Sequence, residues 1–210
     1  MEHDFTPTAL SDAGHKAKEA TRRAPLDAVR ADSAFLWDHA SGELRRDWME
    51  LAGREAPTLA LLIAERALVP GGRAKFVGVD ASPSVALGCA EHFGPEAPAE
   101  WRVGRLESLV SGKGSYPNVG VLVYDTEDGA WRERWGALDR VCTYARRQAD
   151  SLGEFVLVVN ASARFATPAD LDRYRARLAL TARRDVLPEA LHTYRSRDTP
   201  MAWTMLTFGF

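Results

Sequence analysis

The segment AKFVGVDASPSVALGCAEHF, residues 74–93, constrains the fold more than any other part of the chain. It opens with a short apolar run that ends on a single acid, Asp80, as expected for a buried parallel strand. Ser82 then offers a hydroxyl N-cap, Pro83 suits the first helical position, and Gly94 ends the helix about three turns later. A strand that leads directly into a helix predicts an α/β sheet.

The acid at the end of this strand is a candidate ligand-binding group. In open α/β sheets, ligands bind outside the carboxyl ends of the strands, and an acid placed there commonly holds the ribose hydroxyls of a nucleoside cofactor. Asp80 stands at this position, beside the start of a helix. The alternative role for Asp80 is to cap that helix through its backbone amides, although Ser82 already offers a cap.

The composition is that of a globular protein and excludes several classes of function. The chain has 210 residues, which is enough to bury a full core. Its formal net charge of −2 gives no electrostatic case for a nucleic-acid surface. No apolar run reaches the roughly 18 residues that a membrane helix needs, and the acidic N-terminus lacks the apolar core of a secretory signal. We therefore expect a cytoplasmic protein without a membrane span.

Histidine and cysteine spacing predicts no metal site. The five histidines show neither HxxxH nor HExxH spacing, and Cys89 and Cys142 lie too far apart for a CxxC pair. Free cysteine behaves as a small apolar residue, so we expect both thiols in the core.

The alternation of strand and helix continues after this segment. Val119–Tyr124 is a second buried strand that ends on Asp125, and Phe155–Val159 is a third that ends on Asn160. Apolar residues between these strands recur at steps of three and four, which predicts an amphipathic helix closed by Gly153. The stripe consists of Trp131, Trp135, Leu138, Cys142, Ala145, Ala149 and Leu152.

The N-terminal part divides into two predicted regions. Residues 1–32 are polar and predict a helical arm or lid, with a helix near Asp12–Arg23. Residues 33–210 predict the α/β domain, whose first strand we place at Ala34–Trp37. A helix that is apolar almost all round, and therefore buried, follows over Thr58–Val69.

The C-terminal part predicts a helix and a hairpin. Thr167–Asp170 resembles a capping box with proline at the first helical position. Leu191–Ser196 and Met201–Phe208 predict an antiparallel pair at the edge of the sheet. The predicted fold is α/β: a doubly wound, mainly parallel sheet with helices on both faces and a C-terminal antiparallel hairpin.

The motif FVGVDASPSVAL resembles the class I, Rossmann-like S-adenosylmethionine-dependent methyltransferases, and the resemblance covers roughly residues 34–210. In this family the strand that carries the ribose-binding acid commonly reads GvD-x-Sp, and an antiparallel hairpin ends the sheet. The resemblance implies that S-adenosylmethionine is the cofactor and that Asp80, Ala81 and Ser82 lie at its ribose.

The glycine-rich motif of the family is degenerate in this chain. The family has D-x-G-x-G-x-G after its first strand, and the matching segment here, DHASGEL, keeps the acid Asp38 and the middle glycine Gly42. The resemblance places Asp38, Ser41 and Gly42 at the methionine end of the cofactor, while the alternative is an ordinary surface turn. The interval from Asp38 to Asp80 exceeds the roughly 20 residues of a compact unit, so we expect an insertion that includes residues 45–57. Arg105 stands where the family has an acid for the adenine amino group.

Two residues at strand ends are the candidates for catalysis. The resemblance places catalytic or acceptor-orienting groups where Asp125 and Asn160 lie. The alternative for Asp125 is a hydrated acidic loop, because Glu127 and Asp128 follow it closely.

Two functions stay open from the sequence. The first is methyl transfer to a small-molecule or protein acceptor. The second is a non-catalytic, methyltransferase-like scaffold or partner subunit of a larger assembly, either as a homo-oligomer or with another protein; the degenerate turn and the missing adenine acid favour it. A hydride-transferring dehydrogenase is disfavoured, because no GxGxxG follows a predicted strand.

Overall fold

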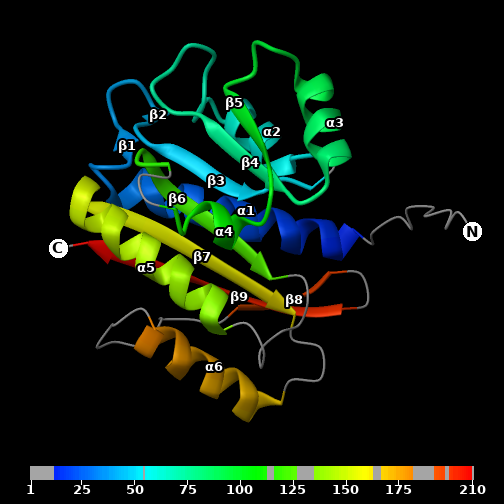
Figure 1. Ribbon diagram of the computed structural model, residues 1–210, viewed down its shortest axis with the longest axis vertical. Helices are drawn as coiled ribbons and strands as arrows, with labels where there is room; N and C mark the ends of the chain where they lie inside the picture. Colours follow the sequence, from blue (N-terminus) through cyan, green and yellow to red (C-terminus); the bar gives the residue numbers. More distant parts are fainter. Residues whose placement is uncertain are drawn as a thin grey trace, which may run out of the picture.

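The core of the molecule is a seven-stranded sheet in the order β5-β4-β3-β6-β7-β9-β8 (Figure 1). The computed structural model describes residues 12–53, 55–112, 116–126, 135–162, 167–181, 192–196 and 199–209. The neighbours from β5 to β7 pair in parallel, whereas β9 pairs antiparallel with both β7 and β8. The strands are β3 (Asp47–Leu51), β4 (Phe76–Asp80), β5 (Ala99–Val103), β6 (Val119–Thr126), β7 (Glu154–Ser162), β8 (His192–Ser196) and β9 (Thr199–Gly209).

Helices cover both faces of this sheet. Side chains of a strand alternate between faces, so Trp48 and Phe76 pack with helices α1, α2 and α3, while Met49 and Val77 pack with α4, α5 and α6. The helices are α1 (Asp12–Asp32), α2 (Pro57–Ala64), α3 (Pro83–Phe93), α4 (Leu106–Leu109), α5 (Trp135–Leu152) and α6 (Pro168–Thr181). The predicted fold class, a doubly wound and mainly parallel sheet with a C-terminal antiparallel pair, is confirmed.

Several predicted elements appear where their local signals put them. Gly94 follows α3 with φ +74°, and Gly153 follows α5 with φ +89°, a backbone region that favours glycine. The capping box before α6 is reciprocal: the Asp170 N–H donates to Thr167 Oγ1 at 3.2 Å, and the Thr167 N–H donates to Asp170 Oδ2 at 2.9 Å. Cys89 and Cys142 are both buried, as expected.

The predicted first strand is wrong. Residues 34–36 form a turn, and Trp37–Asp38 is a two-residue strand, β1, which pairs only with β2 (Glu43–Leu44) in a separate two-stranded sheet. Leu36 and Trp37 are nevertheless buried in the core, which explains their apolar character without a strand in the main sheet. The first strand of the main sheet is β3, within the segment that we expected to be an insertion.

Helix α1 is longer than predicted and is packed on the sheet. It extends to Asp32, and its residues Leu26 and Val29 are buried in the same core layer as α2. Helix α2 is shorter than the predicted Thr58–Val69. In the described ranges no helix has the length and apolarity needed to cross a bilayer.

Candidate functional site

The carboxyl ends of β3, β4 and β5 bring two polar turns together. Asp80, the last residue of β4, lies beside Val103 of β5 in the register, and the Gly104 N–H donates to the Asp80 carbonyl at 2.8 Å. On the other side, the Ala52 N–H donates to the carbonyl of Val79 at 3.0 Å. The turns after β3 and β5 therefore flank the end of β4, where open α/β sheets bind ligands.

The turn after β3 is the one that sequence reasoning missed. It reads ELAGREAP, in which Glu50 is the last residue but one of β3 and Pro57 begins α2. Gly53 has φ +60° and is exposed, and a Cβ built on it would meet nothing within 4 Å. The signal that could have revealed this turn is the acid, the glycine three residues later and the helix-starting proline.

Glu50 is a buried acid on the sheet face that α1 and α2 cover. Its Oε2 accepts a hydrogen bond from the Trp48 indole N–H at 3.0 Å. Burial raises the pKa of the Glu50 carboxyl to about 7; the neighbouring Thr58, Trp48 and Arg22 oppose this rise, and the charge of Asp125 adds to it. A large share of the Glu50 carboxyls is therefore neutral at physiological pH.

Thr58, in the first turn of α2, has a buried hydroxyl close enough to Glu50 to lower the pKa of that acid. Among the described residues its Oγ1 has no partner at full hydrogen-bond geometry. A buried hydroxyl without a partner is unfavourable by roughly 1–3 kcal/mol.

Asp80 caps the entry to α3 with one of its oxygens. The Ser82 N–H donates to Asp80 Oδ1 at 2.8 Å, while Ser82 Oγ contacts Ser84 Oγ at 2.8 Å and makes no cap hydrogen bond of its own. The hydroxyl cap predicted for Ser82 is therefore wrong, and the alternative capping role of Asp80 is present. Asp80 is partly exposed, and Ala81 beside it is exposed.

Cys89 ties the turn after β3 to α3. Its thiol donates to the Gly53 carbonyl at 3.2 Å. Burial, together with the charge of Asp80, raises the pKa of this thiol. The turn after β3 is thus joined to α3 by a hydrogen bond from a neutral side chain.

Asp38, Ser41 and Gly42 do not reach this edge. They form the turn of the β1–β2 hairpin, in which the Gly42 N–H donates to the Asp38 carbonyl at 2.8 Å. The Leu44 N–H bonds the carbonyl of Ala67, after the far end of α2, so the hairpin lies at the amino edge of the sheet (Figure 1). Their predicted position after the first parallel strand is wrong, since β3 takes that place; the alternative, an ordinary surface turn, fits the geometry.

Arg105 stands at the end of β5, as expected. It is the N-cap residue of α4 and is exposed.

Asp125 and Asn160 lie side by side. They are register partners on the parallel strands β6 and β7, and their positions alternate onto the face that carries Glu50. Asn160 is buried and Asp125 is partly exposed. The acids Glu127 and Asp128 lie outside the described residues; within the described part of the chain, no group of three or more His, Cys, Asp or Glu side chains could hold a metal ion.

Solved structures with this fold include methyltransferases. The structure of cofactor-bound Rv0187 from MTB aligns over 96% of this chain and 82% of its own, with a TM-score of 0.55 at 15% identity. The bifunctional kinase-methyltransferase WbdD aligns over 93% of this chain and 40% of its own, with a TM-score of 0.51 at 15% identity. This chain thus spans about two fifths of the length of WbdD. No family model and no curated protein matches the sequence. At these identities the likeness shows that this chain shares the fold of those structures, and nothing finer.

Proposed function

We propose that this chain binds S-adenosylmethionine at the carboxyl ends of β3, β4 and β5 and transfers its methyl group to a small-molecule or protein acceptor. The observation that carries the proposal is the placement of Asp80, which is partly exposed at a strand end between the turns at Gly53 and Gly104. This is the position from which an acid can bind the ribose of a nucleoside.

The residues at this edge fit such a cofactor. Asp80 Oδ1 is held by Ser82, and within the described chain Oδ2 accepts no hydrogen bond, so the ribose hydroxyls could donate to it. The open space above Gly53 would admit the methionine end close to the backbone. Thr58, in the first turn of α2 beside Glu50, would line the same end.

Methyl transfer requires the protein mainly to position the cofactor and the acceptor. When bound, the cofactor supplies a methyl carbon on a sulfonium, which an acceptor attacks in line with the departing sulfur. The protein would hold the two reactants at attacking distance, which can lower the barrier by several kcal/mol. Asp125 and Asn160, adjacent at the ends of β6 and β7, would orient the acceptor.

Calorimetric titration with S-adenosylhomocysteine tests the cofactor site. A hydrogen bond to a charged group contributes about 1.5–3 kcal/mol, so Asp80→Asn should weaken binding by about tenfold or more. Asp38→Asn is the matched control, because Asp38 lies in the β1–β2 hairpin, and its affinity should equal that of the wild type. Absence of binding at millimolar ligand, or equal losses in both variants, would contradict the proposal.

A non-catalytic scaffold is the second candidate. Arg105 in place of an adenine-binding acid favours it, as does a turn after β3 whose one glycine, Gly53, falls between the glycine positions of the family's D-x-G-x-G-x-G pattern. A cofactor cleft filled by Arg105, Glu43 or residues 45–57 would decide for the scaffold; Arg105 is exposed. The same titration separates the two, since a scaffold without a nucleoside site gives no heat.

A further inference from the structure

Helix α1 runs alongside the site from one edge of the sheet to the other. Near its middle, Arg22 lies close enough to Glu50, at the carboxyl end of β3, to lower the pKa of that acid. Just after its end, the Ser33 hydroxyl donates to Glu154 at the amino end of β7. The helix therefore runs antiparallel to the parallel strands, with its N-terminal part toward the carboxyl edge (Figure 1).

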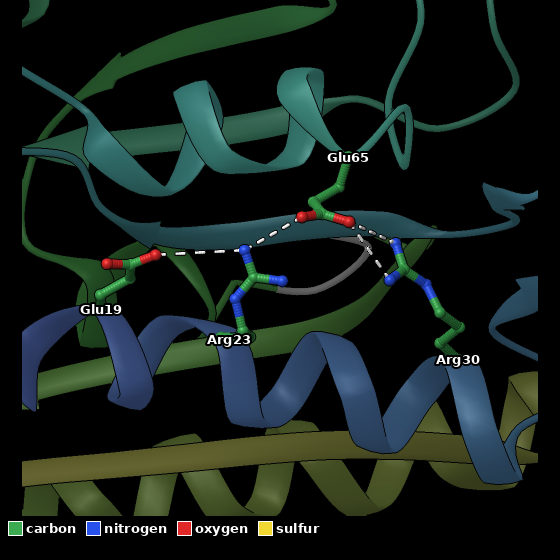
Figure 2. Close-up of polar contacts among 4 residues, drawn as sticks. All are labelled: Glu19, Arg23, Arg30 and Glu65. Atoms are coloured by element: carbon green, nitrogen blue, oxygen red, sulfur yellow. Dashed lines mark hydrogen bonds and ion pairs between the residues drawn. The ribbon is translucent and has the colours of Figure 1, made fainter. Parts of the chain in front are cut away.

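A bracket of ion pairs holds α1 against α2. Figure 2 shows the carboxylate of Glu65 between two arginines of α1 that are separated by about two turns. Arg23 Nη2 lies 3.0 Å from Glu65 Oε1, and Arg30 Nη1 lies 3.3 Å from Oε2. Glu19 adds a longer contact of 4.0 Å to Arg23. The hydrogen bond and charge of Arg23, followed by those of Arg30, lower the pKa of Glu65, so its carboxylate is ionised at neutral pH.

Glu65 stands at the opposite end of α2 from the candidate cofactor turn. It is the C-cap residue of this eight-residue helix, which begins at Pro57, directly after the turn that contains Gly53. Leu59 and Leu62 of α2 are buried in one core layer with α1. Because α2 is short and packed, a shift at Glu65 moves its other end as well.

Helix α1 is thus linked to the unit β3–turn–α2 by the two ion pairs of Glu65 at the end of α2, and the charge of Arg22 also acts on Glu50 near the end of β3. We infer that Glu65 is a positioning residue for the cofactor site, because the ion pairs that hold α1 against α2 keep the turn around Gly53 in the conformation that binds the cofactor. This inference rests on the proposed function. Since coupling between two sites is reciprocal, bound cofactor should in turn stabilise the packing of α1 against α2.

The test compares two acids that are bracketed in the same way. Glu100 lies between Lys75 and Arg102 at the outer edge of the sheet, away from α2, so Glu100→Gln is the matched control for Glu65→Gln. We expect the dissociation constant for S-adenosylhomocysteine to rise about fivefold or more in Glu65→Gln. A fivefold change is at the lower end of the range that is typical when two sites are energetically coupled. Glu100→Gln should bind like the wild type, although both variants lose an ion-paired acid.

Hydrogen exchange supplies the readout that a purely stabilising ion pair would not change. Bound S-adenosylhomocysteine should slow amide exchange along α1 in the wild type and in Glu100→Gln, and have a smaller effect in Glu65→Gln. If Glu65→Gln does not fold, Arg23→Gln replaces it, because this variant keeps the ion pair with Arg30. The same weaker binding and the same smaller effect of ligand on exchange along α1 are then expected. Wild-type affinity in the folded variant overturns the inference and leaves the proposed function standing. A wild-type chain that binds no ligand overturns both.

Discussion

At the scale of single residues, Glu50 combines burial with a position at the candidate site. Its carboxyl is buried, and it accepts a hydrogen bond from the indole N–H of Trp48. Burial raises its pKa from the ordinary value of 4.5 to about 7. The folded state therefore binds a proton here more tightly than the unfolded chain does.

This pKa predicts how Glu50 affects stability. Below about pH 4.5 the acid is neutral in both the folded and the unfolded state. Between pH 4.5 and about 7 the acid ionises in the unfolded chain only, so the free energy of unfolding falls. Above about pH 7 this loss of stability is complete. Glu50→Gln, which stays neutral and can still accept from Trp48, should therefore gain stability over the wild type as pH rises from 5 to 8. The gain should be on the order of 3 kcal/mol.

Urea unfolding of both proteins at several pH values measures this difference. Glu91→Gln, on the exposed side of α3, is the control and should show no such trend. A stability difference between Glu50→Gln and wild type that is the same at pH 5 and pH 8 would refute the buried-acid interpretation.

Two buried acids also explain why β3 was not predicted. The segment DWMEL lacks an apolar run, because Asp47 and Glu50 interrupt it. In the fold, Asp47 Oδ1 accepts from the Lys75 N–H at 2.9 Å and from Asn118 Nδ2 at 3.1 Å. These partners lie far away in the sequence, so no local pattern could show that the acids are satisfied inside a sheet.

At the scale of elements, the β4–α3 unit was predictable because its signals are local. One segment contains all three signals: the apolar run of the strand, the proline at the start of the helix and the glycine after its end. The position of α5 was likewise predictable from its apolar stripe. The position of β4 in the sheet depends on a close approach that its sequence does not show. Gly78 lies under the ring of Trp101, which in turn packs edge-on to Phe76.

A matched pair of glycine substitutions tests this packing. A Cβ on Gly78 would lie 2.4 Å from Trp101 Cζ3, so Gly78→Ala must displace a large core side chain and should destabilise the protein by about 1–3 kcal/mol. Gly88, within α3, has nothing within 4 Å of its Cβ position. Gly88→Ala should therefore stabilise by up to about 1 kcal/mol. Denaturant unfolding of the two variants gives both values, and shifts of the same sign would show that the ring does not lie where the structure has it.

At the scale of the whole molecule, the N-terminal helix belongs to the architecture of the site. The predicted arm is tied to α2 by Glu65 and buries Leu26 and Val29 in the core. The sequence alone showed a polar helix, whose role depends on a partner some forty residues later in the chain, as the Arg23–Glu65 bond illustrates. The fold class and the position of Asp80 at a strand end were predictable; the turn after β3 and the packing of α1 depended on tertiary pairing.

The central claim is that a nucleoside cofactor lies at the carboxyl ends of β3 and β4. A crystal structure of the chain grown with S-adenosylhomocysteine tests it most directly. We predict that the ribose hydroxyls lie within hydrogen-bond distance of Asp80 and that the homocysteine end lies against the turn at Gly53. Ligand bound elsewhere, for example at Asp38 in the β1–β2 hairpin, or no ligand at saturating concentration, would contradict the claim.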